Sequence, residues 1–360
     1  MAKRDSGQSI GEDLLERLEA DIDMPVLPAS FEHLMEMTRR PLDELDPQMV
    51  VKGIEREPAL AARVMRMANS PRYGFVRKVS TLSRAVGLLG LRETLNTVNF
   101  FAFARFVERQ EQLPSSKGRE FWRHSLACAV AARQMAEQSG RGSPGLFYLL
   151  GLFHDVGKLV LMVYAGELFE RCVSFAHQEN KPLQVMEREL LGLDHARIGA
   201  RLLRLWNLPE IFEAVTEAHH APHIASPELQ WTAGCIEMAD MIANLSGIAH
   251  TGNPNNIQID YAWLRQTHHQ DAPHYLDDPQ NLDRLIQSIW NQCDLLGCLV
   301  SAEHEATGAR ASSVQFGETT SFHGCKASRP KHPDVGKHSA NRLGTLVARW
   351  FRSIWQNRAD

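Results

Sequence analysis

The stretch GLFHDVGK, residues 151–158, places a histidine, an aspartate and a lysine inside the most apolar part of the chain. Apolar residues recur at helical spacing over roughly 145–163, which predicts a helix there. Adjacent side chains on a helix differ by about 100° in direction, so His154 and Asp155 can both reach a metal ion held between several helices. The stretch therefore predicts a helical protein with a candidate metal site in its interior.

Nearly all of the chain before residue 248 has the same helical periodicity. Pro58 fits the first position of one helix, Ser80 is expected to cap another, and Gly90 is expected to end that second helix. Further amphipathic segments lie at roughly 91–109, 120–138, 145–163, 183–191, 194–206, 209–219 and 229–247. No alternating run with β-branched residues is long enough to predict a strand. The predicted fold class is all-α.

The composition is that of a globular protein of 360 residues, which is long enough for two folded units. Hydrophobic residues make up 44% and charged residues 23%, which excludes a disordered chain. The net charge is −4, so no nucleic-acid partner is expected, because binding phosphates needs a cationic excess. Six scattered cysteines without a C-x-x-C pair, and an N-terminus without an apolar signal core, predict a cytoplasmic location.

Histidine is frequent, with sixteen residues, and five of them fall in an ordered set with two aspartates. The set is His124, His154, Asp155, His195, His219, His220 and Asp240. Imidazole and carboxylate groups are ligands that Fe, Mn and Zn prefer. We expect His124, His154, Asp155 and Asp240 to form a four-ligand metal site inside a helix bundle. The other three histidines would extend it toward a second ion, with Asp155 as the bridge.

Such a site has both a catalytic and a structural interpretation. A bound ion would acidify a water molecule, and two ions would clamp a phosphoryl group. Lys158 is placed to meet a phosphate, and with Asp155 it would be catalytic if the protein is an enzyme. Each histidine alone also fits a hydrogen-bonded core residue or a residue at a helix end. Asp240 is harder to explain in that way, because its neighbours are apolar and an unpaired buried carboxylate is costly.

The order of these residues resembles that of the HD superfamily of metal-dependent phosphohydrolases. The flanking sequence resembles one branch more closely, the HDOD domain (HD-related output domain) of bacterial signalling proteins. The matching stretches are MPVLP (24–28), EPALAARVMRMANS (57–70), LLGL (88–91), FWRHS (121–125), GLFHDVGK (151–158), GLDHARIGA (192–200) and LWNLP (205–209). Together they cover about residues 20–225.

The resemblance implies a two-lobed, all-α bundle of the HDOD/HD type. Its N-terminal helical lobe would cover 20–110 and its HD-type bundle 115–248. The sequence beyond predicts a partly helical extension at 249–305, a flexible linker at 306–340 and a basic amphipathic helix at 341–360. That last helix fits peripheral contact with an anionic membrane, or packing on its own domain or on a second subunit.

The resemblance also implies a regulatory or output module in bacterial signal transduction, which binds a signalling protein partner or a small ligand such as a nucleotide or phosphate. Most members of the family have no demonstrated enzymatic activity. The alternative is a metal-dependent phosphohydrolase acting on a nucleotide or phosphate ester. The related cyclic-di-GMP phosphodiesterases carry Gly-Tyr-Pro after their paired histidines, whereas residues 221–224 here are APHI, so that activity is not expected. We favour the regulatory, non-catalytic interpretation.

Overall fold

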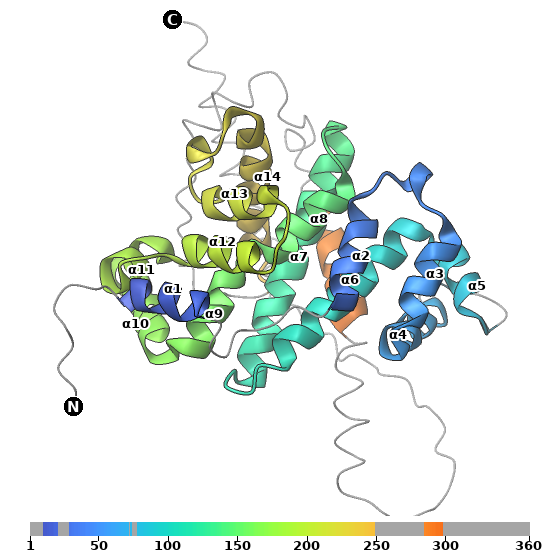
Figure 1. Cartoon of the computed structure of the whole chain (residues 1–360), viewed down its shortest axis with the longest axis horizontal. Coiled ribbons are helices and arrows are strands. Elements are labelled where there is room, and N and C mark those ends of the chain that lie inside the picture. Colours follow the sequence, from blue (N-terminus) through green and yellow to red (C-terminus); the bar gives the residue numbers. More distant parts are fainter. Residues whose placement is uncertain (1–9, 21–28, 72, 74–77, 249–283, 298–360) are drawn as a thin grey trace, which may run out of the picture.

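The protein is all-α in the parts of the chain that the computed structural model describes, residues 10–20, 29–71, 73, 78–248 and 284–297 (Figure 1). The helices in chain order are α1 (Ile10–Glu19), α2 (Ala29–Arg39), η1 (Leu42–Glu44), α3 (Pro47–Glu55), α4 (Pro58–Ala68), α5 (Leu82–Leu89), α6 (Leu91–Glu108), α7 (Ser115–Ser139), α8 (Pro144–Phe153), α9 (Val156–Tyr164), α10 (Gly166–Glu179), α11 (Leu183–Leu191), α12 (His195–Leu205), α13 (Glu210–Ala218), η2 (Pro222–Ile224) and α14 (Pro227–Leu245). The predicted fold class is confirmed.

Helices α2 to α6 form the first of two lobes, on the right in Figure 1. Pro58 occupies the first turn of α4, as predicted. The predicted cap of α5 is wrong by one residue, because the Thr81 hydroxyl, not that of Ser80, accepts the hydrogen bond from the backbone N–H of Arg84 at 3.3 Å. Gly90 ends α5 as predicted, with a φ of 84° that favours glycine.

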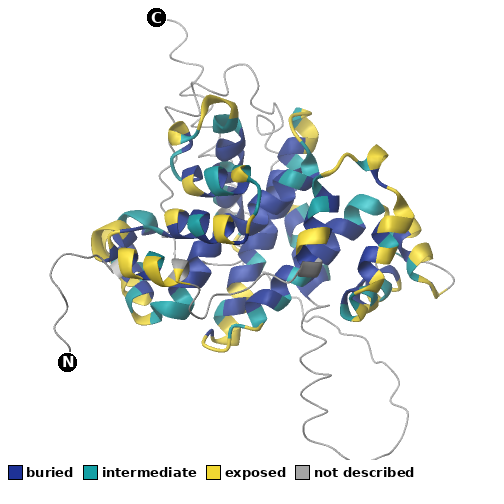
Figure 2. Cartoon of the chain, viewed as in Figure 1, coloured by how far each residue is buried: buried dark blue, intermediate teal, exposed yellow. Residues whose placement is uncertain are grey.

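Helix α6 joins the two lobes and is buried on almost every side (Figure 2). Its side chains Phe100 and Phe103 are fully buried. Phe100 meets Trp122 of α7 edge-on with ring centroids 5.5 Å apart, and Phe103 meets Phe153 of α8 in the same way at 5.3 Å. Aromatic pairs of this geometry contribute beyond their buried area, so α6 fixes the positions of α7 and α8.

Helices α7 to α14 form the second lobe around the 25-residue helix α7. Helix α1 also lies in this lobe, against α12, and a Cβ at Gly11 would come within 2.7 Å of Leu193. The helical segment 284–297 returns to α7, where the Gln134 amide donates to the Ser288 hydroxyl at 2.6 Å. Neither packing arrangement follows from the sequence pattern, because amphipathic spacing shows which face is buried but not its partner.

The predicted single helix at 145–163 is instead two helices, because the chain turns at His154 and Asp155. The combined stretch Pro144–Tyr164 is apolar and long enough to cross a membrane by length and composition. However, 83% of its apolar window is buried inside the protein. Core packing therefore accounts for its composition.

Several sequence predictions fall outside the described residues. They concern the MPVLP stretch, most of the extension at 249–305, the linker at 306–340 and the amphipathic helix at 341–360. These stay predictions, as do the lobe boundaries at 20–110 and 115–248.

Candidate metal centre

The C-terminal end of α8 is fixed by an aromatic cluster around Phe153. Its ring centroid lies 5.7 Å from that of Phe31 in α2, 5.3 Å from that of Phe103 in α6 and 6.3 Å from that of Phe212 in α13. Because side chains of three other helices hold this ring, the turn that follows it has a defined position. That turn carries His154 and Asp155.

Two glycines allow the neighbouring helices to approach this turn. A Cβ at Gly151 would lie 2.8 Å from the Cα of Ala129, so α8 presses against α7, which carries His124. A Cβ at Gly157 would lie 1.9 Å from the carbonyl oxygen of His195, so α9 presses against the start of α12. The glycines of the GLFHDVGK stretch thus bring His124 and His195 to the same place.

Asp155 lies at the centre of the cluster and uses both carboxylate oxygens. Its Oδ2 is 3.4 Å from Nε2 of His124 and 3.3 Å from Nε2 of His154. Its Oδ1 is 3.3 Å from Nε2 of His195 and 3.7 Å from Nε2 of His219. The two oxygens therefore face different pairs of imidazoles.

The remaining two candidates complete one group on each side. Asp240 Oδ1 of α14 lies 2.9 Å from Nε2 of His124 and 3.7 Å from Nε2 of His154. His220 Nε2 lies 2.8 Å from Nε2 of His195. All seven predicted residues thus meet in two groups that share Asp155, and within each group the ligand atoms lie within 4.8 Å of one another.

These spacings suit atoms around a common ion. Ligands held at about 2.0–2.3 Å from one metal ion lie about 2.8–3.8 Å from each other when their bonds meet at right or tetrahedral angles. The Nε2-to-oxygen distances in the group of His124, His154, Asp155 and Asp240 run from 2.9 to 3.7 Å. The second group, Asp155 with His195, His219 and His220, spans a similar range.

Three of the imidazoles are held in one orientation through their other ring nitrogen. His154 Nδ1 donates to the Gly151 carbonyl at 2.8 Å, and His219 Nδ1 donates to the Thr216 carbonyl at 2.6 Å. His195 Nδ1 lies 2.6 Å from a Glu187 carboxylate oxygen. A proton on Nδ1 leaves the lone pair on Nε2, which is the arrangement that metal-ligating histidines have.

The atoms that face the centre lack the hydrogen bonds that buried polar atoms normally make. Nε2 of His124, His154 and His219, and Oδ1 of Asp155, are buried and lie near one another or near Asp240, but they make no hydrogen bond of normal geometry with a described residue. Leaving a buried polar atom without a hydrogen bond costs about 1–3 kcal/mol. Divalent ions would satisfy all of them, so the residues present fit a metal centre.

Charge is unevenly distributed over the cluster. Burial alone would lower the pKa of His154, but the Asp155 carboxylate more than offsets this effect, so the pKa lies well above its usual value. For His195, burial is outweighed by Glu187, which raises the pKa to about 9. Burial lowers the pKa of His219, and burial together with the neighbouring imidazoles lowers that of His220 much further. Without a metal, one part of the cluster therefore holds protons and another part does not.

Lys158 does not stand free to meet a phosphate. Its Nζ lies 2.7 Å from Asp155 Oδ2, and the side chain is only 1% exposed. Burial raises the pKa of Asp155, but the charges of His154 and Lys158 outweigh it and hold the pKa well below its usual range. Lys158 thus stabilises the Asp155 carboxylate, and a role toward phosphate stays a prediction.

Two residues of the site were not predicted from the sequence. Glu187 is fully buried and also accepts the backbone N–H of His195 at 2.9 Å. Asn244 donates to Asp240 Oδ1 at 2.8 Å. Glu187 falls on the buried face of α11 with Leu183 and Met186, so a carboxylate at a core position was the available signal. Asn244 lies one helical turn after Asp240, which is the spacing of a side-chain pair.

The sequence of this site matches a known family. A family model described as the HDOD domain matches residues 24–222. The chain belongs to the HDOD domain family. The match includes six of the seven candidate ligands. The seventh, Asp240, lies in α14, beyond the end of the match.

Solved structures show the same fold. An HDOD domain protein of unknown function from Geobacter sulfurreducens is 22% identical, with a TM-score of 0.60, over 83% of this chain and 94% of that one. A phosphohydrolase candidate from Shewanella amazonensis SB2B is 22% identical, with a TM-score of 0.56, over 79% of this chain and 97% of that one. A signal-transduction protein candidate from Marinobacter aquaeolei VT8 is 22% identical, with a TM-score of 0.63, over 79% and 64% of the two chains.

One curated relative matches part of the chain. An uncharacterized protein of Treponema pallidum (strain Nichols) is 26% identical over 205 residues, which are 56% of this chain and 38% of that protein. The chain thus spans well under half the length of that relative.

Proposed function

We propose that this HDOD protein is a regulatory module of bacterial signal transduction that binds a partner protein or a small ligand and does not turn over substrate. The observation that carries the proposal is the closure of the centre. His124, His154, Asp155, His195 and His219 are 0% exposed and Asp240 is 5% exposed. A phosphate ester has to contact the ions and the attacking water, which such burial prevents.

We further propose that the cluster holds a divalent ion such as Fe, Mn or Zn, with His124, His154, Asp155 and Asp240 as ligands, and that His195, His219 and His220 complete a second position with Asp155. Such an ion supplies Lewis-acid chemistry and lowers the pKa of a bound water molecule. In the regulatory role its contribution is structural, because it would tie α7, α8, α12, α13 and α14 together. Glu187 and Asn244 orient the ligands His195 and Asp240.

The second candidate function is a metal-dependent phosphohydrolase. Two ligand groups that share one carboxylate favour it, because two neighbouring ions can stabilise both the attacking and the leaving oxygen when a phosphoryl group is displaced in line. His220, the one partly exposed candidate ligand, marks the side on which a substrate would have to enter. This function requires the lobe to open, and Lys158 to leave Asp155 before it could meet a phosphate.

Turnover by the metal-loaded full chain distinguishes the two functions. The protein is purified without chelators, its Fe, Mn and Zn contents are measured, and it is assayed with bis(p-nitrophenyl) phosphate and with linear and cyclic nucleotides. The matched control is the His154→Ala/Asp155→Ala double variant. The regulatory proposal predicts bound metal and no turnover above that of the double variant. Metal-dependent turnover that the double variant lacks would overturn it.

A further inference from the structure

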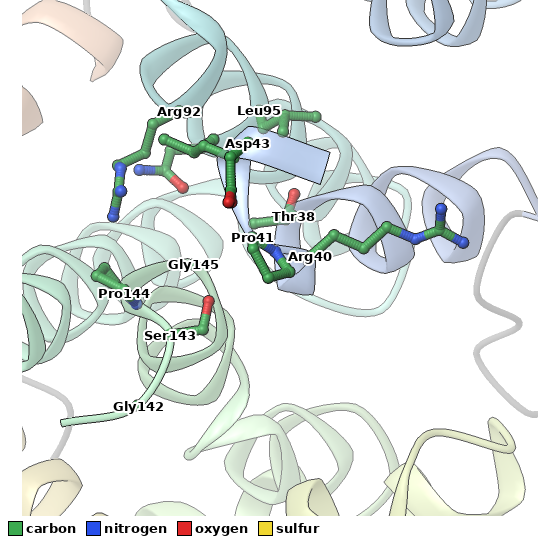
Figure 3. Close-up of a pocket in the computed structure, with 12 residues that line it drawn as sticks. Thr38, Arg40, Pro41, Asp43, Arg92, Leu95, Gly142, Ser143, Pro144 and Gly145 are labelled. Atoms are coloured by element: carbon green, nitrogen blue, oxygen red, sulfur yellow. The ribbon is translucent and has the colours of Figure 1, made fainter. Parts of the chain in front are cut away.

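We propose that a second site, remote from the metal cluster, binds a nucleoside phosphate in the cavity between α2, α6 and α8. The cavity has a volume of about 570 Å³ and is drawn in Figure 3. Small-molecule sites commonly measure about 300–1,000 Å³, so the space suits a ligand of nucleotide size. It lies where the first lobe meets the second, and no residue of the metal cluster lines it.

The floor of the cavity carries a polar side chain that has no partner. Asn96 lines the cavity and is 3% exposed, and neither its amide nitrogen nor its amide oxygen makes a hydrogen bond with a described residue. Asn99, three residues later on α6, does have partners, because its amide nitrogen donates to Thr38 Oγ1 at 2.6 Å and to the backbone carbonyl of Leu95 at 2.8 Å. An amide left with both a donor and an acceptor matches a ligand edge that offers both, such as that of a nucleobase.

One wall of the cavity is the N-terminal end of α8. Ser143 is the N-cap of this 10-residue helix, but its side chain makes no capping hydrogen bond. Pro144 at the first position has no N–H, and the Phe147 N–H donates to the Ser143 carbonyl at 3.1 Å. The first-turn N–H groups of Gly145 and Leu146, together with the helix dipole, are therefore the ones that favour an anion. A Cβ at Gly145 would lie 2.1 Å from the Thr38 carbonyl oxygen, so this end of α8 is pressed against α2 and the wall is rigid.

Two charged side chains define the rest of the ligand. In Figure 3, Arg92 extends toward Pro144, whereas Arg40 points away from the rest of the lining. One guanidinium nitrogen of Arg92, Nη1, lies 3.5 Å from Oε1 of Glu137. The other guanidinium N–H groups are left for a phosphate. Asp43 faces the same cavity and would repel a bare anion, but its carboxylate can accept hydrogen bonds from ribose hydroxyls. A nucleotide would therefore place its phosphate at Arg92 and the start of α8, its ribose hydroxyls at Asp43 and its base at Asn96.

The position of the cavity gives it a route to the metal cluster. Helix α8 begins at the cavity with Pro144 and ends at Phe153, and His154 and Asp155 follow directly. Ten helical residues span about 15 Å. A nucleotide that pulls on the first turn of α8 would therefore act on the residue pair at its other end, and the cavity would serve as the small-ligand site of a regulatory module.

Isothermal titration of the full chain tests this site. The probes are ATP, ADP, AMP, adenosine and inorganic phosphate, all in EDTA so that the metal cluster is empty. We expect at least one of the three nucleotides to bind with 1:1 stoichiometry, and Arg92→Gln to weaken it at least about tenfold by loss of charge-assisted hydrogen bonds. Asn96→Ser should weaken it as well. Arg109→Gln, which removes an exposed arginine at the other end of α6, should leave the affinity unchanged.

Any of three outcomes would overturn the proposal. The first is that no nucleotide binds with 1:1 stoichiometry, the second is that a nucleotide binds Arg92→Gln as tightly as the unaltered chain, and the third is that inorganic phosphate binds as tightly as the nucleotides. Loss of binding in His154→Ala/Asp155→Ala, with folding intact by circular dichroism and with binding unchanged in Arg92→Gln and Asn96→Ser, would place the nucleotide at the metal cluster instead. Because turnover is not measured here, the result is independent of the test of the proposed function.

Discussion

Gly157 and His195 are in backbone contact: a Cβ on Gly157 would lie 1.9 Å from the carbonyl oxygen of His195. The same contact places α9 on α12, and His195 Nε2 then lies 3.3 Å from Asp155 Oδ1. A glycine therefore sets the distance between two of the candidate ligands.

Gly157→Ala is expected to destabilise the fold. Overpacking of a core typically costs about 1–3 kcal/mol, and here the obstacle is backbone, which cannot rotate away. Urea unfolding of the metal-free variant measures the loss. Gly87→Ala is the matched control, because its Cβ meets nothing within 4 Å in the exposed face of α5 and alanine favours helix. Equal stability of the two variants would contradict the backbone contact.

Glu187→Gln is expected to weaken metal binding without unfolding the chain. Glu187 holds His195 through both the ring Nδ1 and the backbone N–H, and loss of such supporting partners costs about 10–100-fold in metal affinity. Competition with a chromophoric chelator measures the affinity for Zn²⁺. Glu189→Gln, which changes an exposed residue of the same helix, should match the unaltered protein. An unchanged affinity in Glu187→Gln would show that His195 does not bind the ion.

Metal binding is expected to release protons at pH 7.5. The pKa of His154 lies well above its usual value and that of His195 is about 9, so both are protonated in the metal-free protein at this pH. A metal ligand must be a neutral imidazole, so each of the two has to lose its proton, and binding should tighten as the pH rises toward 9. Titration calorimetry of Zn²⁺ in buffers of different ionisation enthalpy counts the protons. Heats that do not depend on the buffer would contradict this assignment.

Four buried thiols are expected to be inert in the folded protein. Burial raises the pKa of Cys172 to about 11 and that of Cys293 to about 12, and it also raises those of Cys128 and Cys235. At pH 8 the reactive thiolate is therefore scarce. In a Cys298→Ser/Cys325→Ser background, Ellman's reagent should label the chain only after guanidinium is added. Rapid labelling of the native protein would contradict the burial of these thiols.

The sequence identified the cluster better than its surroundings. His154 and Asp155 were recognisable because ionisable groups inside an apolar segment are costly unless they have a task. The break between α8 and α9 at those residues could not be predicted, because apolar periodicity continues across the turn. The cap at Thr81 rather than Ser80 is a choice between adjacent hydroxyls that only backbone geometry decides.

Tertiary partners explain the other gaps. Asn96 reads as an ordinary polar residue of a helix, and its lack of a partner depends on how α2 and α8 approach α6. The pairing of Lys158 with Asp155 could be anticipated from their i, i+3 spacing, but the burial of that pair could not. Amphipathic periodicity locates the buried face of a helix and leaves its neighbours open.

Metal content of three single variants tests the central claim, that Asp155 joins two ligand groups. The full chain, His124→Ala, His219→Ala and Asp155→Ala are purified without chelators and their Fe, Mn and Zn contents are measured by mass spectrometry. Because Asp155 lies in both groups and each histidine in one, Asp155→Ala should lose the metal of both sites, and each histidine variant should keep more metal than Asp155→Ala. An Asp155→Ala variant that folds and keeps the metal content of the unaltered chain would contradict the account.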